Sequence, residues 1–148
     1  MKTAIALCLL LAVTSAEYVV KNEENLQQFR RECATELKVP AEHIEQFRKW
    51  QFPNDSVTQC YLKCVFEKFG LFDAETGFNV EHIHQQLQGA EVAPPGDADH
   101  DDVVHDKIAA CVDTNEQGSN ACEWAYRGGV CFIKENLQLV KHSVKPQA

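Results

Sequence analysis

The fold is decided by the stretch Gln59-Cys60-Tyr61-Leu62-Lys63-Cys64-Val65-Phe66-Glu67-Lys68. Its two cysteines are four residues apart, so on a helix they lie on the same face. Two thiols on one face can be tied to two different helices packed against it. The other face is apolar as well, so the helix is expected to be buried on more than one side. We therefore predict a central helix over residues 56–69.

Apolar residues at helical intervals predict five more helices. They cover residues 22–37, 41–50, 80–88, 102–114 and 119–133. The side chain of Asn54 or Asp55 can cap the central helix, and Gly70 suits its C-terminal end. No stretch alternates with the period of a strand over a useful length. The sequence thus predicts an all-α chain, a single compact bundle of about six helices.

The first sixteen residues have the features of a secretory signal. Lys2 precedes an apolar run from Ala4 to Val13, and small residues follow at Thr14-Ser15-Ala16. We expect residues 1–16 to be removed and residues 17–148 to form one secreted, extracellular domain. Removal takes Cys8 with it, so seven cysteines become six, an even set suited to disulfides in an oxidising compartment. No later stretch approaches the length of a membrane span, so stable membrane insertion is not expected.

Charge narrows the range of partners. The formal net charge is −8, and a polyanion repels both nucleic acid and anionic membrane surfaces. We expect no nucleic-acid partner.

Two adjacent glycines, Gly128 and Gly129, fall inside the predicted helix 119–133. Each costs roughly 1 kcal/mol against alanine in a helix interior. We expect either a bend at this point or a very close approach of another backbone.

The cysteine spacing carries a family resemblance. The six mature cysteines are separated by 26, 3, 46, 10 and 8 residues, in the order Cys33, Cys60, Cys64, Cys111, Cys122, Cys131. Six cysteines allow about 15 pairings, and spacing alone does not choose among them. A C-x3-C pair on a central helix followed much later by C-x8-C resembles the six-cysteine odorant-binding proteins of insects, which include the pheromone-binding proteins. The resemblance covers essentially the whole mature chain.

The resemblance implies a fold and a function. It implies three interlocked bridges, Cys33 to Cys64, Cys60 to Cys122 and Cys111 to Cys131, that hold the helices around an internal apolar cavity. It also implies a carrier that transports a small hydrophobic molecule, such as an odorant, a pheromone or a lipid-like compound, through aqueous fluid. The resemblance also suggests two further partners, a sensory receptor and a second copy of the chain. The interval of 46 residues is long, and the extra length is expected in a loop over 89–101 that could cover the cavity mouth.

The expected ligand-binding residues are large apolar side chains that face inward, each of which could equally be ordinary core. They are Phe47, Trp50, Phe52, Leu62, Phe66, Phe69, Phe72, Ile83, Leu87, Ile108, Trp124, Phe132, Leu137 and Leu139. Tyr61 and Tyr126 could offer a hydroxyl to a ligand or make a structural hydrogen bond. The C-terminal tail 137–148 is expected to line or cover the cavity, with a frayed end as the alternative.

Other classes of function have less support. The sequence has no nucleophile elbow, zinc-protease motif or phosphate loop, so no catalysis and no cofactor is expected. No metal site is expected either, because His82 and His84 are two residues apart and do not share a helix face. Histidines beside the 89–101 loop, including His100 and His105, could open it at mildly acidic pH, although surface histidines without a role are the simpler interpretation. The main alternative is a secreted signalling or inhibitor module that binds a protein by its surface.

Overall fold

The computed structural model describes residues 17–88 and 98–144, and only the backbone of 98–103. The expected signal peptide, residues 89–97 of the expected loop, and residues 145–148 lie outside this part of the chain. The described elements are α1 (Glu23–Glu36), α2 (Ala41–Arg48), α3 (Ser56–Phe69), β1 (Phe72–Asp73), β2 (Gly77–Phe78), α4 (Val80–Gln88), α5 (Ala98–Cys111), α6 (Ala121–Glu135) and α7 (Leu137–Ser143). The chain is thus mostly helical, with one two-stranded antiparallel ribbon in the described part.

Helix α3 begins and ends where the sequence predicts. The Asp55 side chain accepts a hydrogen bond from the Thr58 N–H at 2.8 Å, which caps the first turn. Gly70 ends the helix with a left-handed conformation, φ 75°. Both signals are local, so they can be identified without knowledge of the tertiary structure.

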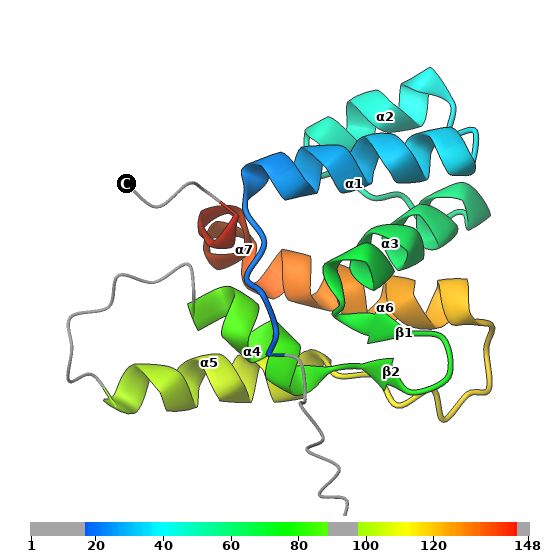
Figure 1. Ribbon diagram of the computed structural model, residues 1–148. Coiled ribbons are helices and arrows are strands. Elements are labelled where there is room, and N and C mark those ends of the chain that lie inside the picture. Colours follow the sequence, from blue (N-terminus) through cyan, green and yellow to red (C-terminus); the bar gives the residue numbers. More distant parts are fainter. Residues whose placement is uncertain (1–16, 89–97, 145–148) are drawn as a thin grey trace, which may run out of the picture.

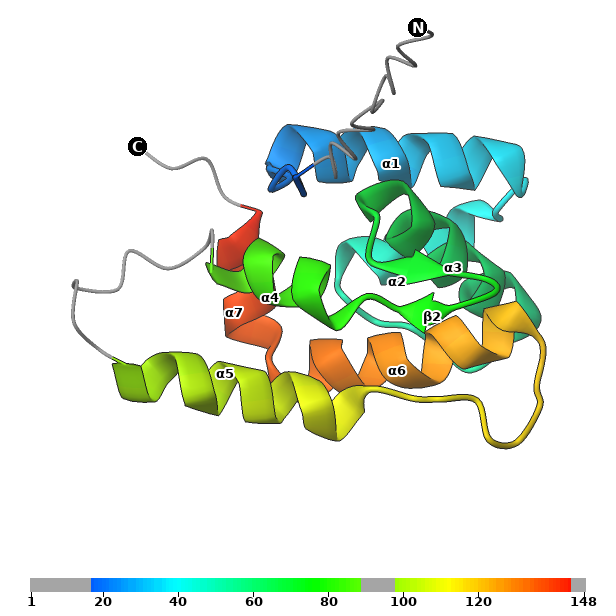
Figure 2. The same ribbon diagram turned by 60° about the horizontal axis from the view of Figure 1, so that its bottom comes forward.

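Two of the three disulfides start from α3. Cys60 is bonded to Cys122 on α6, and Cys64 to Cys33 on α1. The third bridge joins the end of α5 to α6 through Cys111 and Cys131. These are the pairs that the family resemblance implies. Helices α3 and α6 make the most extensive helix contact, and they lie between α1 on one side and α5 on the other (Figure 1 and Figure 2).

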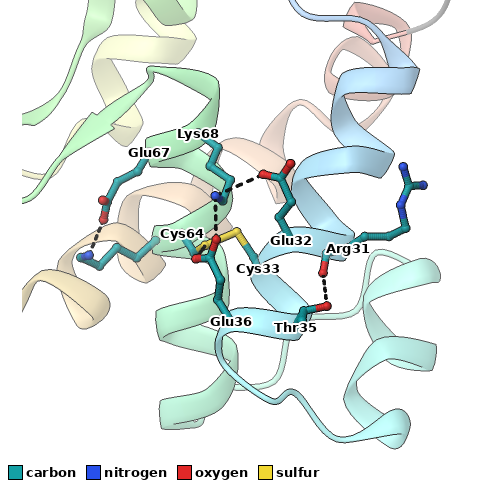
Figure 3. Close-up of a disulfide and its surroundings, with 9 residues drawn as sticks. Arg31, Glu32, Cys33, Thr35, Glu36, Cys64, Glu67 and Lys68 are labelled. Atoms are coloured by element: carbon teal, nitrogen blue, oxygen red, sulfur yellow. Dashed lines mark hydrogen bonds and ion pairs between the residues drawn. A yellow bond between two sulfur atoms is a disulfide. The ribbon is translucent and has the colours of Figure 1, made fainter.

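Charged side chains line the α1–α3 seam beside the Cys33–Cys64 bridge (Figure 3). The Lys68 ammonium lies 3.2 Å from a carboxylate oxygen of Glu32 and 3.0 Å from one of Glu36. Exposed ion pairs of this kind contribute at most about 1 kcal/mol each. The covalent bond and the apolar contacts beneath it therefore decide how these helices pack.

The observed elements differ from the predicted ones mainly at the chain's turns and at its end. Helix α2 ends at Arg48, two residues early, and Trp50 follows with φ 58°. Helix α5 begins at Ala98 instead of residue 102. The tail, for which the sequence predicted no regular structure, forms α7. A helix this short is not stable alone, so its formation depends on the packing of its apolar side against the bundle.

A bend or a very close approach of another backbone was expected at the two adjacent glycines, and the structure instead places an aromatic ring against each of them. Helix α6 runs unbroken from Ala121 to Glu135. A Cβ placed on Gly128 would lie 2.3 Å from Cε2 of Phe78, and one on Gly129 would lie 2.1 Å from Cε2 of Phe66. The glycines thus provide the space into which two phenyl rings pack.

The loop between α5 and α6 is held by an ion pair. The Arg127 guanidinium donates to both carboxylate oxygens of Asp113, at 2.8 and 3.1 Å. The Trp124 indole N–H also donates to the backbone oxygen of Asp113, at 2.6 Å. The hydrogen bonds from Arg127, helped by the Asn115 N–H, hold the pKa of the Asp113 carboxyl below its ordinary value, against the opposing effect of burial.

This ion pair should make stability depend on acidity. Because the pKa of Asp113 is lower in the folded chain, its contribution is present above about pH 4, the unfolded value, and is lost as the pH falls through the folded value. We expect Asp113→Asn to lower the free energy of unfolding by about 1 to 2 kcal/mol at pH 6, because charged hydrogen bonds are lost. The difference in the free energy of unfolding between Asp113→Asn and the original chain should be smaller at pH 3 than at pH 6. Urea unfolding of both chains at the two pH values measures this, and an equal difference at both would contradict it.

Candidate ligand pocket

The pocket lies between two hydrophobic clusters. One cluster centres on α1, α2 and α3, and includes Leu26, Leu62 and Phe69. The other contains Ile83 and Leu87 of α4 with residues of α5 and α6. A cavity of about 100 Å³ separates them. It is bounded by elements that two disulfides hold in place, Cys33–Cys64 and Cys60–Cys122.

The pocket wall is mostly apolar. Eight of its residues belong to the set expected from sequence, namely Trp50, Phe52, Leu62, Phe66, Phe69, Ile83, Leu87 and Phe132. The other lining residues are Leu26, Arg30, Tyr61, Val65, Leu71, Phe78, Gln86, Ile133, Asn136, Val140, Ser143 and Val144. Among the described residues, no carboxylate lines the wall.

Six expected residues lie elsewhere, in ordinary core. Phe47 is 2% exposed and stacks on Tyr61 with 4.2 Å between ring centroids, so Tyr61 separates it from the cavity. Ile108 is fully buried in the α4–α5–α6 cluster. Phe72 and Trp124 belong to a third buried cluster, and Leu137 and Leu139 are partly buried side chains that pack against the first two clusters. Sequence identifies a buried aromatic or aliphatic residue but not which of its faces meets a cavity.

Four of the lining residues outside the expected set show why the sequence prediction was incomplete. Leu26 and Val65 are on apolar helix faces that the sequence does show, so a wider selection would have included them. Gln86 and Asn136 carry no such signal, because polar side chains in helices and at helix ends usually face water. Their burial, 3% and 6% exposed, follows from how α4 and α7 pack.

The buried Gln86 amide, on α4, joins the N-terminal segment and the end of α7. Its oxygen accepts from the Tyr18 hydroxyl and from the Lys21 N–H, both at 2.8 Å. Its nitrogen donates to the backbone oxygens of Lys21 at 2.9 Å and of Ser143 at 3.3 Å. Every hydrogen-bonding position of this amide is therefore used to hold the N-terminal segment and α7 against α4.

A guanidinium and a phenol occur in the α1–α3 part of the wall. The Arg30 guanidinium lies 4.8 Å from the centre of the Trp50 ring, a cation–π contact. Burial lowers the pKa of Arg30. Burial also raises the pKa of Tyr61 to about 12, with Arg30 opposing that effect. The Tyr61 hydroxyl is consequently neutral at physiological pH. Tyr126, by contrast, donates its hydroxyl to the backbone oxygen of Phe52 at 2.9 Å and has a structural role.

Helix α7 contributes Val140 and Ser143 to the wall, and Val144 directly after it contributes a third side chain. We predict that ending the chain after Asn136 weakens binding of an apolar fluorescent probe at least tenfold and speeds its release. The reason is that two valine surfaces are lost, each of which contributes about 1.5 kcal/mol when fully covered. Stopped-flow and equilibrium fluorescence measure both quantities. The control is a chain that ends after Val144, and equal behaviour of the two truncated chains would refute this role for α7.

The histidines are distributed over separate environments. His82 stacks on Tyr18, and its Nδ1 lies 2.7 Å from the Gly70 backbone oxygen. The rings of His84 and His105 are 6.0 Å apart. The side chain of His100 lies outside the described residues. No group of three or more potential metal ligands occurs in the described part of the chain. Nor does any helix found there have the length and apolarity needed to cross a membrane.

Comparisons with known proteins agree on one family. The model of the PBP/GOBP family matches residues 15–135. The chain is 54% identical to general odorant-binding protein 99a of Drosophila melanogaster over 148 residues, which cover 100% of both chains. It is 45% identical to odorant-binding protein 22 of Aedes aegypti, over 98% of this chain and 99% of the relative. Among solved structures, odorant-binding protein lmigOBP1 of Locusta migratoria matches with a TM-score of 0.57 and 19% identity, over 87% of this chain and 92% of that one, which shows a shared fold.

Proposed function

The chain belongs to the PBP/GOBP family, and from this premise we propose that it takes up its ligand in the pocket between the two clusters and carries it through extracellular fluid. The general function, a carrier of small hydrophobic molecules, follows from the family. The ligand-binding residues and the secretion are our proposal. The proposed binding residues are the lining residues, with Trp50, Phe66, Phe69 and Phe132 supplying the largest surfaces.

One observation carries the assignment of the pocket: an apolar cavity lies at the centre of a disulfide-tied bundle. Ligand sites are typically concave and apolar, with a few polar groups that fix orientation. Here apolar side chains from α1, α3, α4, α6 and α7 converge, with only a few polar groups among them. A protein-binding module needs no such interior.

The cavity volume limits what fits without movement. An engineered apolar cavity of about 150 Å³ holds benzene, and this one has about 100 Å³. A longer chain therefore requires the wall to move outward. Helix α7 is the element suited to this, because the hydrogen bond from Gln86 to the Ser143 backbone oxygen, which ties its far end to α4, is long at 3.3 Å.

A series of straight-chain alcohols tests this proposal. Each added methylene that enters the pocket should contribute about 0.8 kcal/mol, so affinity should rise about fourfold per carbon and level off when the pocket is full. Displacement of N-phenyl-1-naphthylamine from the chain 17–148 measures the affinities. Val65→Phe, which adds a ring inside the pocket, should shorten the rising part of the series. Val19→Phe, at a position 69% exposed, is the control. Affinity that does not depend on chain length would contradict the proposal.

A further inference from the structure

The Asn136 side chain is a buried polar group with no partner. It is 6% exposed and lines the pocket. Neither its oxygen Oδ1 nor its nitrogen Nδ2 makes a hydrogen bond within the described part of the chain. Its backbone N–H, in contrast, donates to the Phe132 oxygen at 3.0 Å, so the residue has a structural role through its main chain alone.

Leaving this carboxamide unpaired is costly. A buried donor or acceptor without a partner costs about 1 to 3 kcal/mol, and in Asn136 both the donor nitrogen and the acceptor oxygen of the side chain lack one. Its neighbours in the wall include Phe132, Ile133 and Val140, which offer no hydrogen-bonding side chain. Leucine has a similar shape and would avoid this cost. A polar side chain at this position is accounted for if the bound ligand supplies the missing partner.

Two other polar side chains of the wall are already committed. All four hydrogen bonds of the Gln86 amide go to Tyr18, Lys21 and Ser143. The Ser143 hydroxyl donates to the Val140 backbone oxygen at 2.8 Å. At the Trp50 side of the wall, Arg30 lies against an aromatic ring and remains partly exposed, so water can solvate it. Within residues 17–88 and 98–144, Asn136 is thus the wall residue whose buried side-chain oxygen and nitrogen lack a partner.

We propose that Asn136 binds the hydroxyl group of the ligand, which makes this carrier selective for small apolar alcohols. A hydroxyl both accepts a hydrogen bond, here from the Nδ2 amide, and donates one, here to Oδ1. An ether, ester or aldehyde oxygen accepts only, and leaves Oδ1 unpaired. A carboxylate also accepts only, and its charge would have to be buried among apolar side chains. The inference rests on the proposed function, since it assigns the ligand's polar end within the same pocket.

Isomeric ligands separate the head group from the apolar body. 1-Octanol and 1-methoxyheptane have the same atoms and nearly the same length, but only the alcohol can donate. We expect the chain 17–148 to bind 1-octanol about tenfold more tightly than 1-methoxyheptane or octanal, measured by displacement of N-phenyl-1-naphthylamine. In Asn136→Leu this preference should fall to about one, while binding of the dye and of the ether is retained or improved.

A nearby substitution serves as the matched control. Gln138→Leu introduces the same residue at an exposed position two residues away on α7, and it should leave the tenfold preference unchanged. Far-UV circular dichroism and thermal unfolding establish that each variant is folded. Asn136→Leu is expected to unfold at a higher temperature than the original chain without ligand, because it removes the unpaired polar group.

The outcomes distinguish the inference from the proposed function. If all ligands displace the dye equally, or if Asn136→Leu keeps the preference for the alcohol, the inference is overturned and the carrier function stands. If octanoate binds best and Arg30→Gln abolishes that binding, the polar end lies at Arg30 and the inference is also overturned. If no ligand displaces the dye from the pocket, both the inference and the proposed function are contradicted.

Discussion

Replacing Cys60 and Cys122 together with alanine is expected to lower the free energy of unfolding by about 4 kcal/mol. The two sulfurs close a loop of 62 residues between α3 and α6, the helices in most extensive contact. In the chain-entropy model a crosslink restricts the unfolded chain more as the loop lengthens. Urea unfolding of the double variant, compared with the original chain, measures the loss.

The other two bridges provide an internal comparison. Cys33–Cys64 and Cys111–Cys131 close loops of 31 and 20 residues. Each halving of loop length should reduce the effect by about 0.6 kcal/mol, so the three double variants should rank in the order of loop length. A loss below about 1 kcal/mol for Cys60 and Cys122 would contradict the view that this bridge holds the centre of the bundle.

Gly129→Ala is expected to destabilise the chain by up to about 2 kcal/mol, although alanine is the better helix former. Intrinsic propensity alone favours alanine by roughly 1 kcal/mol. The added Cβ, however, would lie 2.1 Å from Cε2 and 2.6 Å from Cζ of Phe66, so the ring must move. Overpacking of this kind typically costs about 1 to 3 kcal/mol. Because Phe66 lines the pocket, the displaced ring should also weaken ligand binding.

A double-mutant cycle isolates this contact. Phe66→Leu leaves room for the new methyl group, so Gly129→Ala should be neutral or stabilising in the Phe66→Leu background. Thermal unfolding and dye affinity are measured for the four chains of the cycle. If alanine stabilises the chain equally in both backgrounds, Gly129 has no part in positioning the ring.

The sequence predicts the helices well where the signals are local. The C-x3-C pair, the Asp55 cap and Gly70 are all close in the chain, and α3 has the predicted bounds. The pairing of the cysteines came from a family resemblance, because residues 20 to 62 positions apart carry no local signal of contact. Helix α7 was missed for a related reason: its formation depends on a surface that only the assembled bundle provides.

The pocket was predictable in composition but not in detail. Phe66 and Phe72 look alike in sequence, yet one lines the cavity and the other packs against Trp124 with 5.3 Å between ring centroids. Asn136 could not be found at all, since its burial results from the turn between α6 and α7. Which face of a side chain meets a cavity depends on how helices are offset, and this is set by long-range packing.

The most direct test of the central claim, that ligands bind in this cavity, uses the two tryptophans. Trp50 lines the pocket and Trp124 does not. In Trp124→Phe, Trp50 is the remaining tryptophan. Its fluorescence should be quenched by 8-bromo-1-octanol to a plateau as the concentration rises, and 1-octanol should reverse the quenching. In Trp50→Phe the emission of Trp124 should remain unchanged while dye displacement confirms that the ligand still binds. Saturable quenching of Trp124, with none of Trp50, would contradict the account.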